Sequence, residues 1–257
     1  MSAIRFLTDH GAPPDQAEFV LLFVPYAGAG AQAGRRLAGA LPPHIAGASV
    51  QYPGRGDRRD DPPHLDIVSF ANEIADEIAA SAWFAGKPVQ LYGHSMGAAI
   101  AFETARLLEA RGVPPARLIV SGRRAPGAGL GVAAPRDDDT IVAHLRATGA
   151  VAQSVLARPA FRESILSVVR HDFAANAGYT APKDATIATR VTFLLSNADS
   201  YVDRAGAEQW ADYTRGGFDL HLFDGDHFFL NVQPSQVVAT IVASSAQPVT
   251  GRDAARS

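Results

Sequence analysis

The sequence predicts an α/β fold, in which a mostly parallel central sheet carries flanking helices and an inserted helical lid. Short continuous apolar runs, typical of strands buried on both faces, alternate with segments whose apolar residues recur at helical spacing. About 60 residues without a strand pattern separate two of these runs, and we interpret them as a lid inserted into the core. The chain has 257 residues, 47% of them hydrophobic, which suffices for one large domain.

Each expected element follows from a local pattern. Strands are expected where apolar runs end at turn residues, which is at 4–7 (a short edge strand), 19–24, 46–52, 89–92, 117–122, 190–195 and 218–223. Helical spacing predicts helices at 32–41, 65–84, 96–111, 205–214 and 235–244, and in the lid at 137–148 and 158–178. We therefore divide the chain into a core in two parts (18–122 and 186–246), a lid (123–185) and a disordered tail (247–257).

The composition argues against several classes of protein. A net charge of −3 argues against a general nucleic-acid binder. The chain has no cysteine, which removes disulfides, thiolate catalysis and thiolate metal sites and agrees with a cytoplasmic location. The N-terminal stretch lacks a long apolar core, and no run approaches the ~20 apolar residues of a membrane helix, so we expect no signal peptide and no membrane association. No ligand spacing of a metal hydrolase occurs, so no metal is expected.

The segment 93–97 fits the motif G-x-S-x-G and lies between a strand that ends at Tyr92 and a helix that begins at Met96. In that context Ser95 occupies a tight, strained turn above the sheet edge, and the two glycines let strand and helix pass closely. The helix N-terminus beneath the serine adds N–H groups and a positive dipole end, which suit a developing oxyanion. We interpret Ser95 as a nucleophile. The alternative is a serine that merely caps the helix.

Two residues that follow late strands complete a candidate catalytic set. His227 is the one histidine, among eight, that lies in a glycine-containing turn directly after a strand, so it is the candidate base. Asp199 lies just past the strand 190–195, where an acid can orient that base. The order serine, acid, histidine is that of α/β-hydrolases. His94, inside the motif, is expected to be structural. The competing acids are Asp203, Asp224 and Asp226.

Two loops follow early strands. The loop 25–30 consists largely of small residues, and at the end of an early strand it can bring a backbone N–H close to a reacting carbonyl. A dinucleotide-binding loop is disfavoured there, because the third glycine position holds Ala33 and no acid ends the second strand at the expected place. The loop 51–58 is expected on the surface, with Arg55 and Asp57 as a solvated pair worth little.

Five blocks of sequence carry a resemblance to a known family: 23–28 (F-V-P-Y-A-G), 51–58 (Q-Y-P-G-R-G-D-R), 93–98 (G-H-S-M-G-A), 121–126 (S-G-R-R-A-P) and 225–230 (G-D-H-F-F-L). With these blocks the chain resembles, over about 19–232, the type II (editing) thioesterases that accompany polyketide and non-ribosomal peptide synthases. The second and fourth blocks are far more specific than G-x-S-x-G, and they select this family among hydrolases.

The resemblance implies an α/β-hydrolase core with a helical lid. By position it makes Ser95, Asp199 and His227 a catalytic triad, and the backbone N–H groups of Ala27 and Met96 an oxyanion hole. The implied activity is removal of aberrant or stalled acyl groups from the phosphopantetheine arm of an acyl or peptidyl carrier protein. No cofactor is implied, because the partner carries its own phosphopantetheine.

The chain also departs from the family pattern. Family members usually carry His at the position of Tyr26 and a second Gly at that of Ala29, and the acid loop 196–200 differs from the usual G-D-x-D-P. These departures bear mainly on acyl preference. Two alternatives to a thioesterase are a carboxylesterase or lipase, and a non-catalytic scaffold that binds a small molecule or a partner.

The lid is expected to open, because a carrier protein must deliver a long arm to Ser95. Its apolar residues are expected either to line a substrate channel or to pack the lid onto the core. They are Ile141, Leu145, Val151, Leu156, Phe161, Ile165, Val168 and Phe173.

Overall fold

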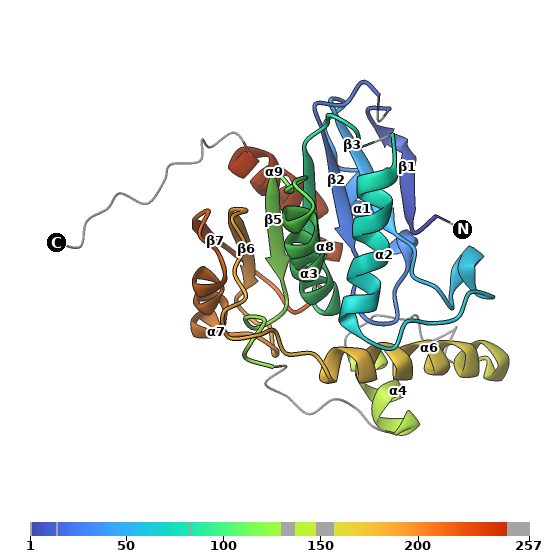
Figure 1. Cartoon of the computed structure of the whole chain (residues 1–257). Coiled ribbons are helices and arrows are strands. Elements are labelled where there is room, and N and C mark those ends of the chain that lie inside the picture. The colour runs from blue at the N-terminus through green and yellow to red at the C-terminus, as the bar shows by residue number, and fades with distance from the viewer. Residues whose placement is uncertain (1, 14, 83, 130–136, 148–156, 246–257) are drawn as a thin grey trace.

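The central sheet, within the part of the chain that the structure describes, has seven strands in the order β1-β3-β2-β4-β5-β6-β7. All neighbouring strands are parallel except β1 and β3. This computed structural model describes residues 2–13, 15–82, 84–129, 137–147 and 157–245. The strands are β1 (Ile4–Gly11), β2 (Phe19–Val24), β3 (Ile45–Val50), β4 (Val89–His94), β5 (Arg117–Ser121), β6 (Val191–Ser196) and β7 (Phe218–Phe223). The predicted α/β fold is confirmed (Figure 1).

Helices cover both faces of the sheet and bury two apolar clusters. The larger cluster joins the sheet to α2, α3 and the region of α7 and η3, and the other joins it to α1, α8 and α9. The helices of these two layers are η1 (Ala31–Gly34), α1 (Arg35–Ala38), η2 (Gly56–Arg58), α2 (Ile67–Ala80), α3 (Met96–Ala110), α7 (Arg204–Glu208), η3 (Gln209–Tyr213), α8 (Phe229–Val232) and α9 (Pro234–Ser245).

Two further helices, α4 (Asp138–Ala147) and α6 (Pro159–Ala177), come between β5 and β6 in the chain. Figure 1 shows both beyond one end of the sheet, where α6 runs across the end at which β5 finishes. Because β5 runs parallel to β4 and β6, this is the edge where those strands also end. The two described helices of the insertion expected at 123–185 therefore lie over the edge that carries Ser95. The tail expected at 247–257 lies outside the described residues.

The helix expected over 205–214 is split into α7 and η3, and two other expected helices differ from their predicted bounds for local reasons. The helix expected over 32–41 is split into η1 and α1. Gly34 lies at the break, where it lets the chain approach β3: a Cβ on Gly34 would lie 2.9 Å from the Ser49 Oγ. The helix expected over 65–84 begins at residue 67, because the Asp66 carboxylate accepts a hydrogen bond from the N–H three residues on and so caps it.

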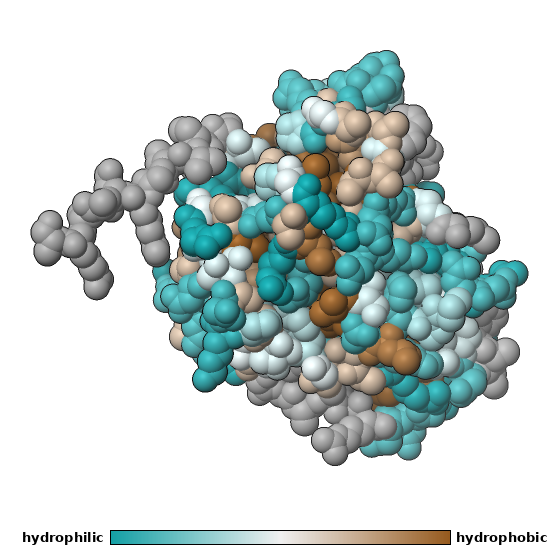
Figure 2. All heavy atoms as spheres, in the orientation of Figure 1, coloured by the Kyte–Doolittle hydropathy of each residue, from teal (hydrophilic) through white to brown (hydrophobic). Residues whose placement is uncertain are grey.

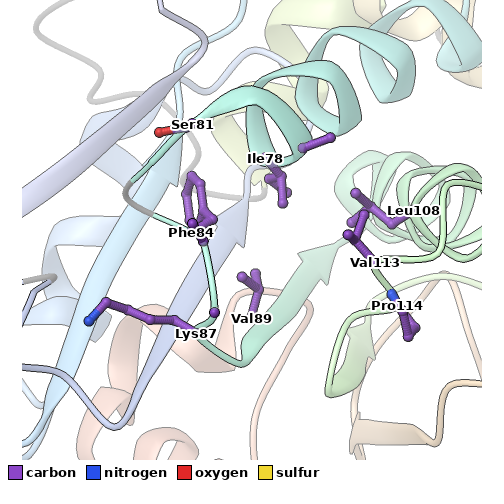
Figure 3. A pocket seen from close by; sticks show the side chains of 11 residues that line it. Ile78, Ser81, Phe84, Lys87, Val89, Leu108, Val113 and Pro114 are labelled. Carbon is purple, nitrogen blue, oxygen red and sulfur yellow. The ribbon is translucent and has the colours of Figure 1, made fainter.

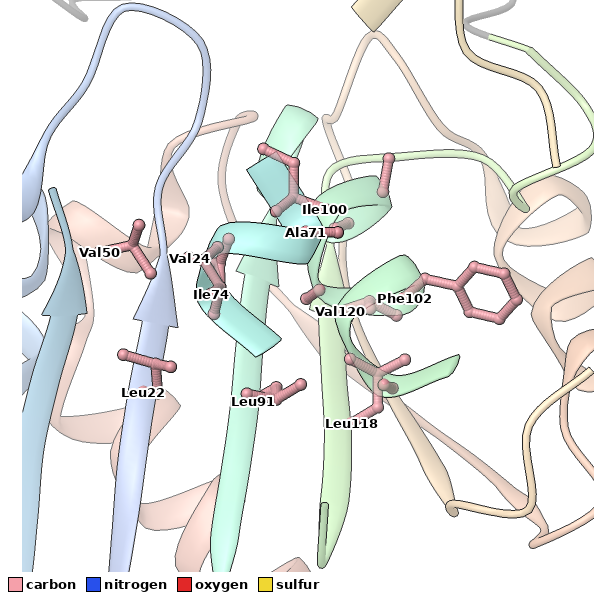
Figure 4. Packing of buried hydrophobic residues seen from close by; sticks show 14 of the residues in the cluster. Leu22, Val24, Val50, Ala71, Ile74, Leu91, Ile100, Phe102, Leu118 and Val120 are labelled. Atoms are coloured by element: carbon pink, nitrogen blue, oxygen red, sulfur yellow. The ribbon is translucent and has the colours of Figure 1, made fainter. Parts of the chain in front are cut away.

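The main core lies between the sheet and α2 and α3. Figure 4 shows Leu22, Leu91 and Leu118 on three neighbouring strands, packed with Ile74 of α2 and Ile100 of α3. These five side chains are at most 1% exposed. Each fully buried aliphatic side chain stabilises the fold by about 1.5–3 kcal/mol relative to exposure. The packing therefore fixes the junction between β4 and α3, which is where Ser95 lies.

The surface is mainly hydrophilic, with apolar residues scattered between polar ones on the face that Figure 2 shows. Among the residues that the structure describes, the large apolar side chains that remain exposed are Leu65, Val68, Val113, Leu222 and Val232. Among the helices of the described residues, none combines the length and apolar character that crossing a bilayer demands.

A core prediction follows from the packing on α3. Phe102 is fully buried and meets Trp210 and Tyr213 edge to face, with ring centroids 5.9 and 5.8 Å apart. We expect Phe102→Ala to lower the free energy of unfolding by about 3–5 kcal/mol, because it leaves a cavity between rigid aromatic rings. Urea denaturation measures the change. The exposed Val113→Ala serves as control and should stay within about 0.5 kcal/mol. A loss below about 1 kcal/mol for Phe102→Ala would contradict this account.

Candidate active site

Ser95 lies in a strained turn between β4 and α3. Its φ is 55° and its ψ −118°, and it is the one non-glycine residue with positive φ in the described part of the chain. The turn is held by two backbone hydrogen bonds: the Ser95 N–H donates to the Ser121 carbonyl at 2.9 Å, and the Ser95 carbonyl accepts from Ala98 at 3.0 Å. The Ser95 side chain makes no capping bond to α3, so the interpretation of Ser95 as a simple helix cap is wrong.

The glycines on either side of Ser95 are required by close backbone contacts. A Cβ on Gly93 would lie 2.3 Å from the Gly97 carbonyl oxygen, and one on Gly97 would lie 1.9 Å from the Val24 carbonyl oxygen. Both separations are far below a van der Waals contact. The spacing of G-x-S-x-G therefore records how tightly α3 crosses the ends of β4 and β2.

His227 and Asp199 meet beside this turn. His227 follows β7 and Asp199 follows β6, and the His227 Nδ1 lies 3.0 and 3.1 Å from the two Asp199 carboxylate oxygens. The Asp199 side chain is 1% exposed and that of His227 is 8% exposed. Asp199 also accepts a hydrogen bond from the Tyr201 N–H at 2.8 Å. An ionised carboxylate so held fixes Nδ1 as the protonated nitrogen, which leaves Nε2 free to accept a proton.

The three competing acids have other partners. Asp203 caps α7 by accepting from the Gly206 N–H at 2.8 Å. Asp224 accepts from the Asn197 side chain, and Asp226 from the Phe228 N–H. Among the four candidate acids, the structure brings Asp199 against His227.

The His227 ring is packed among residues of the serine turn. Its centroid lies 4.7 Å from that of His94 and 4.5 Å from that of Tyr201. A Cβ on Gly122 would lie 2.8 Å from the His227 Cε1 and 2.5 Å from the His94 Cε1, so the residue after Ser121 must be small. These contacts place His227 beside the carboxyl ends of β4 and β5, next to the turn that holds Ser95.

His94 behaves as a structural residue of this cluster, as expected. It is fully buried, and its Nδ1 lies 2.8 Å from the Ser121 Oγ, which is also 3.1 Å from the Tyr92 hydroxyl. Burial, and secondarily the charge that His227 carries when protonated, hold the pKa of His94 well below its ordinary value. His94 therefore stays neutral at physiological pH, and the site contains one histidine, not two, placed for proton transfer.

The loop after β2 brings backbone amides to the same edge. It turns tightly, because the Ala29 N–H donates to the Tyr26 carbonyl at 3.1 Å and Gly28 has a φ of 81°. The Gly28 N–H donates to the Asp172 carboxylate at 2.7 Å. Within the described residues, the Ala27 N–H makes no hydrogen bond, unlike those of Gly28 and Ala29. Met96, the first residue of α3, lies at a helix N-terminus, where amides lack partners within the helix.

Sequence reasoning assigned Arg55 the wrong partner. Arg55 is buried and makes two parallel bonds to Asp172 of α6, from Nη1 at 2.6 Å and Nη2 at 2.7 Å. Asp57, its expected partner, instead pairs with Arg5 at 2.9 Å. The pairing depends on where α6 lies over the sheet edge, and the sequence around residue 55 contains no sign of it.

The apolar residues of the lid pack largely against one another. Ile141 and Leu145 of α4, and Leu166 and Val169 of α6, are at most 2% exposed in one cluster. Phe173 and Ile165 lie partly buried against that cluster. Ile141 and Leu145 thus pack α4 against α6 within the lid, which is neither of the two expected roles. Of the remaining positions, Val151 and Leu156 and the side chain of Phe161 lie outside the described residues.

Two cavities differ in their relation to this site. One of about 430 Å³ borders the loop after β2 and is lined by Tyr26, Ala29, Arg36 and Asn231, among others. Another of about 230 Å³ lies among Ile78, Phe84, Lys87, Val89, Leu108 and Val113 (Figure 3). Val89 begins β4, so this second cavity is at the opposite end of that strand from Ser95 and takes no part in the site. The described residues contain no cluster of histidine and acid side chains fit to hold a metal.

The close crossing at Gly97 yields a stability prediction. Gly97→Ala should prevent folding or displace α3 from the end of β2, because the added Cβ would overlap the Val24 carbonyl oxygen, which belongs to the sheet. Gly112→Ala is the matched control: Gly112 also matters for its conformation, with φ 75°, but a Cβ there meets nothing within 4 Å. We expect that control to cost about 1–2 kcal/mol. Circular dichroism and thermal melting compare the two, and similar melts would refute the steric argument.

Comparisons with known proteins agree with this geometry. Residues 19–244 match the thioesterase domain family. Over 237 residues the chain is 36% identical to a probable cadicidin biosynthesis thioesterase of Streptomyces griseus, covering 91% of this chain and 64% of that one. It is 34% identical to the thioesterase PikA5 of Streptomyces venezuelae, covering 87% and 79%. The phenyloxazoline synthase MbtB of Mycobacterium tuberculosis is 36% identical over 15% of its length. The chain thus spans less than two thirds of the first curated relatives it matches.

Solved structures are also similar. YbtT, a type II thioesterase from the yersiniabactin pathway, superposes with a TM-score of 0.85 at 28% identity, covering 94% of this chain and 97% of that one. BorB, the type II thioesterase of the borrelidin biosynthetic cluster, gives 0.83 at 31% identity, covering 96% and 99%. The likeness to type II thioesterases predicted from sequence is confirmed, and the chain belongs to the thioesterase domain family, with an α/β-hydrolase fold.

Proposed function

We propose that this chain is a serine thioesterase that hydrolyses acyl thioesters on the phosphopantetheine arm of acyl or peptidyl carrier proteins. It would thereby remove aberrant or stalled acyl groups during polyketide or non-ribosomal peptide biosynthesis. One observation carries the proposal: the His227–Asp199 hydrogen bond lies beside the strained turn of Ser95, in a chain of the thioesterase domain family.

In the proposed reaction Ser95 Oγ attacks the thioester carbonyl while His227 Nε2 takes the hydroxyl proton. Asp199 holds the Nδ1 proton and offsets the imidazolium charge. The carbon–sulfur bond then breaks. A thiolate leaves easily, so the bond can break before the sulfur is protonated. The departing thiolate then takes the proton from His227 Nε2, which leaves His227 neutral again. A water that His227 deprotonates next attacks the acyl-serine and releases the free acid, which restores the Ser95 hydroxyl.

The oxyanion formed in both steps would be held by the N–H groups of Ala27 and Met96. The free state of the Ala27 amide supports this assignment, because the next amide, that of Gly28, is engaged by Asp172. In a model hydrolase, one such donor lowers the activation barrier by about 3–4 kcal/mol. The reaction so written uses only side chains and amides of the protein, and we propose no metal or bound cofactor for it.

The relatives support the proposed partner and substrate. Similar proteins are described as a probable thioesterase of cadicidin biosynthesis and as type II thioesterases of yersiniabactin and borrelidin biosynthesis. Carrier-bound acyl groups are therefore the proposed substrate, and a cytoplasmic location stays a prediction. The test compares kcat/KM for acyl groups on a phosphopantetheinylated carrier protein with kcat/KM for p-nitrophenyl esters of the same acids. A clear preference for the simple esters would favour a carboxylesterase instead.

The nucleophile assignment predicts the result of Ser95→Ala. We expect kcat on an acyl-carrier thioester to fall by about 10⁶-fold, to the level that oxyanion binding alone sustains. The melting temperature should stay within a few degrees of wild type, since the Ser95 side chain does not cap α3. Steady-state assay and thermal melting check both. A variant that keeps wild-type kcat would exclude Ser95 as nucleophile and favour a non-catalytic scaffold.

The acid assignment predicts an asymmetry among four aspartates. Asp199→Asn should lower kcat by about 10⁴-fold, because the amide no longer fixes the His227 tautomer or offsets its charge. The control variants Asp203→Asn, Asp224→Asn and Asp226→Asn should lose much less, since their carboxylates bond to other groups. Steady-state kcat on one thioester substrate ranks all four. If a control proved the most damaging, the acid role would pass to that residue.

A further inference from the structure

A buried carboxylate on the lid helix α6 binds the loop that follows β2. Asp172 of α6 is fully buried and accepts three hydrogen bonds, one from the Gly28 N–H at 2.7 Å and two from Arg55. The same Arg55 Nη1 also donates to the Ala29 carbonyl at 2.9 Å. The ion pair thus holds an N–H of residue 28 and a C=O of residue 29, directly after the proposed oxyanion donor Ala27.

An apolar contact between α6 and the loop adds to these hydrogen bonds. Val169, one turn before Asp172 on α6, lies so close to Gly28 that a Cβ there would be 2.9 Å from its Cγ2. Gly28 has φ 81°, so a side chain is disfavoured on two grounds. The position of α6 therefore determines where the loop lies.

We propose that Asp172, together with Arg55, is a positioning residue that aims the Ala27 N–H at the reacting carbonyl oxygen. The inference rests on the proposed thioesterase function. Oxyanion donors act through geometry, and a shift of about 1 Å can lower a rate by about a hundredfold. Removing the Asp172 charge would free the Gly28 amide and the Arg55 guanidinium together, and both groups would then compete for other partners.

A second buried anchor on the same helix provides a control. Asn176, one turn after Asp172, accepts a hydrogen bond from the buried Arg123, whose guanidinium also lies 5.5 Å from the Tyr179 ring centroid. The described contacts of this anchor join α6 to Arg123, outside the loop. Asn176→Ala therefore removes one attachment of α6 to the body, while Asp172 and Val169 still hold α6 against Gly28.

A second carboxylate, Asp219, provides a control for the loss of an anion that arginine binds. Asp219 lies at the amino end of β7 and binds Arg190 at 2.6 Å and Arg117 at 3.2 Å. It is far along the strand from the catalytic edge. Asp172→Asn removes a carboxylate that Arg55 binds, and Asp219→Asn removes one that two arginines bind. The Asp219→Asn change leaves the loop after β2 untouched.

The experiment measures kcat and KM on hexanoyl-pantetheine and, separately, affinity for a trifluoromethyl ketone of the same chain. The trifluoromethyl ketone forms a covalent adduct with the enzyme. In this adduct a bond forms between Ser95 Oγ and the carbonyl carbon, the serine proton passes to His227, and an oxyanion remains. We expect Asp172→Asn to lower kcat about ten- to hundredfold with little change in KM. The affinity for the trifluoromethyl ketone should fall by a similar factor. Affinity for the matching methyl ketone, which forms no stable adduct, should not change.

Both control variants should keep kcat within about threefold of wild type when each is assayed well below its own melting temperature. Arg55→Lys keeps the positive charge but cannot make two parallel bonds, so it should reproduce the kcat loss even if Asp172→Asn folds poorly. A folded Asp172→Asn or Arg55→Lys with wild-type kcat would overturn the proposal, as would an equal loss in Asn176→Ala or a loss confined to KM. A wild-type enzyme inactive on every thioester would instead remove the proposed function itself, so the two failures are distinguishable.

Discussion

The contact between Gly97 and the Val24 carbonyl is the constraint on which the site depends. It lets the first turn of α3 pass over the end of β2 at a distance that no side chain permits. The turn before this crossing holds Ser95 at positive φ, and Gly97 also lies against the Pro25 carbonyl, where the loop that carries Ala27 begins. The buried aliphatic contacts of α3 with the sheet hold this arrangement against its strain, which costs of the order of 1–3 kcal/mol.

Around that crossing, two buried carboxylates are matched by hydrogen bonds at short range, as a buried charge requires. Asp199 receives the His227 ring and the Tyr201 amide, and Asp172 receives Arg55 and the Gly28 amide. Each carboxylate thus bonds one side chain and one backbone N–H. In a medium of low dielectric these bonds are directional and strong, so each one orients as well as stabilises its partner. The edge is preorganised before any substrate arrives.

The sequence predicted those features that depend on residues close together along the chain. Strand runs, the serine turn and the turn that holds His227 follow from local patterns, and the strand order of parallel units brings their ends to one edge. Asp199 was predicted from its place after a strand, and its contact with His227 agrees with that choice. Arg55 could not be paired correctly, because its partner lies 117 positions away on a helix whose placement no local pattern specifies. Helix ends shifted for a similar reason, since caps and close approaches decide them.

The same geometry explains two departures from the family pattern. Ala29 contributes its carbonyl oxygen to Arg55, and the positive φ of this turn falls on Gly28, so a methyl group at 29 is tolerated where relatives carry glycine. Tyr26 packs edge to face on Phe228 at 4.8 Å and on His94 at 5.8 Å, and burial raises the pKa of its hydroxyl. It therefore remains a neutral wall of the site, where an imidazole could carry charge. We therefore expect these two departures to bear on acyl preference and to leave the proposed chemistry unchanged.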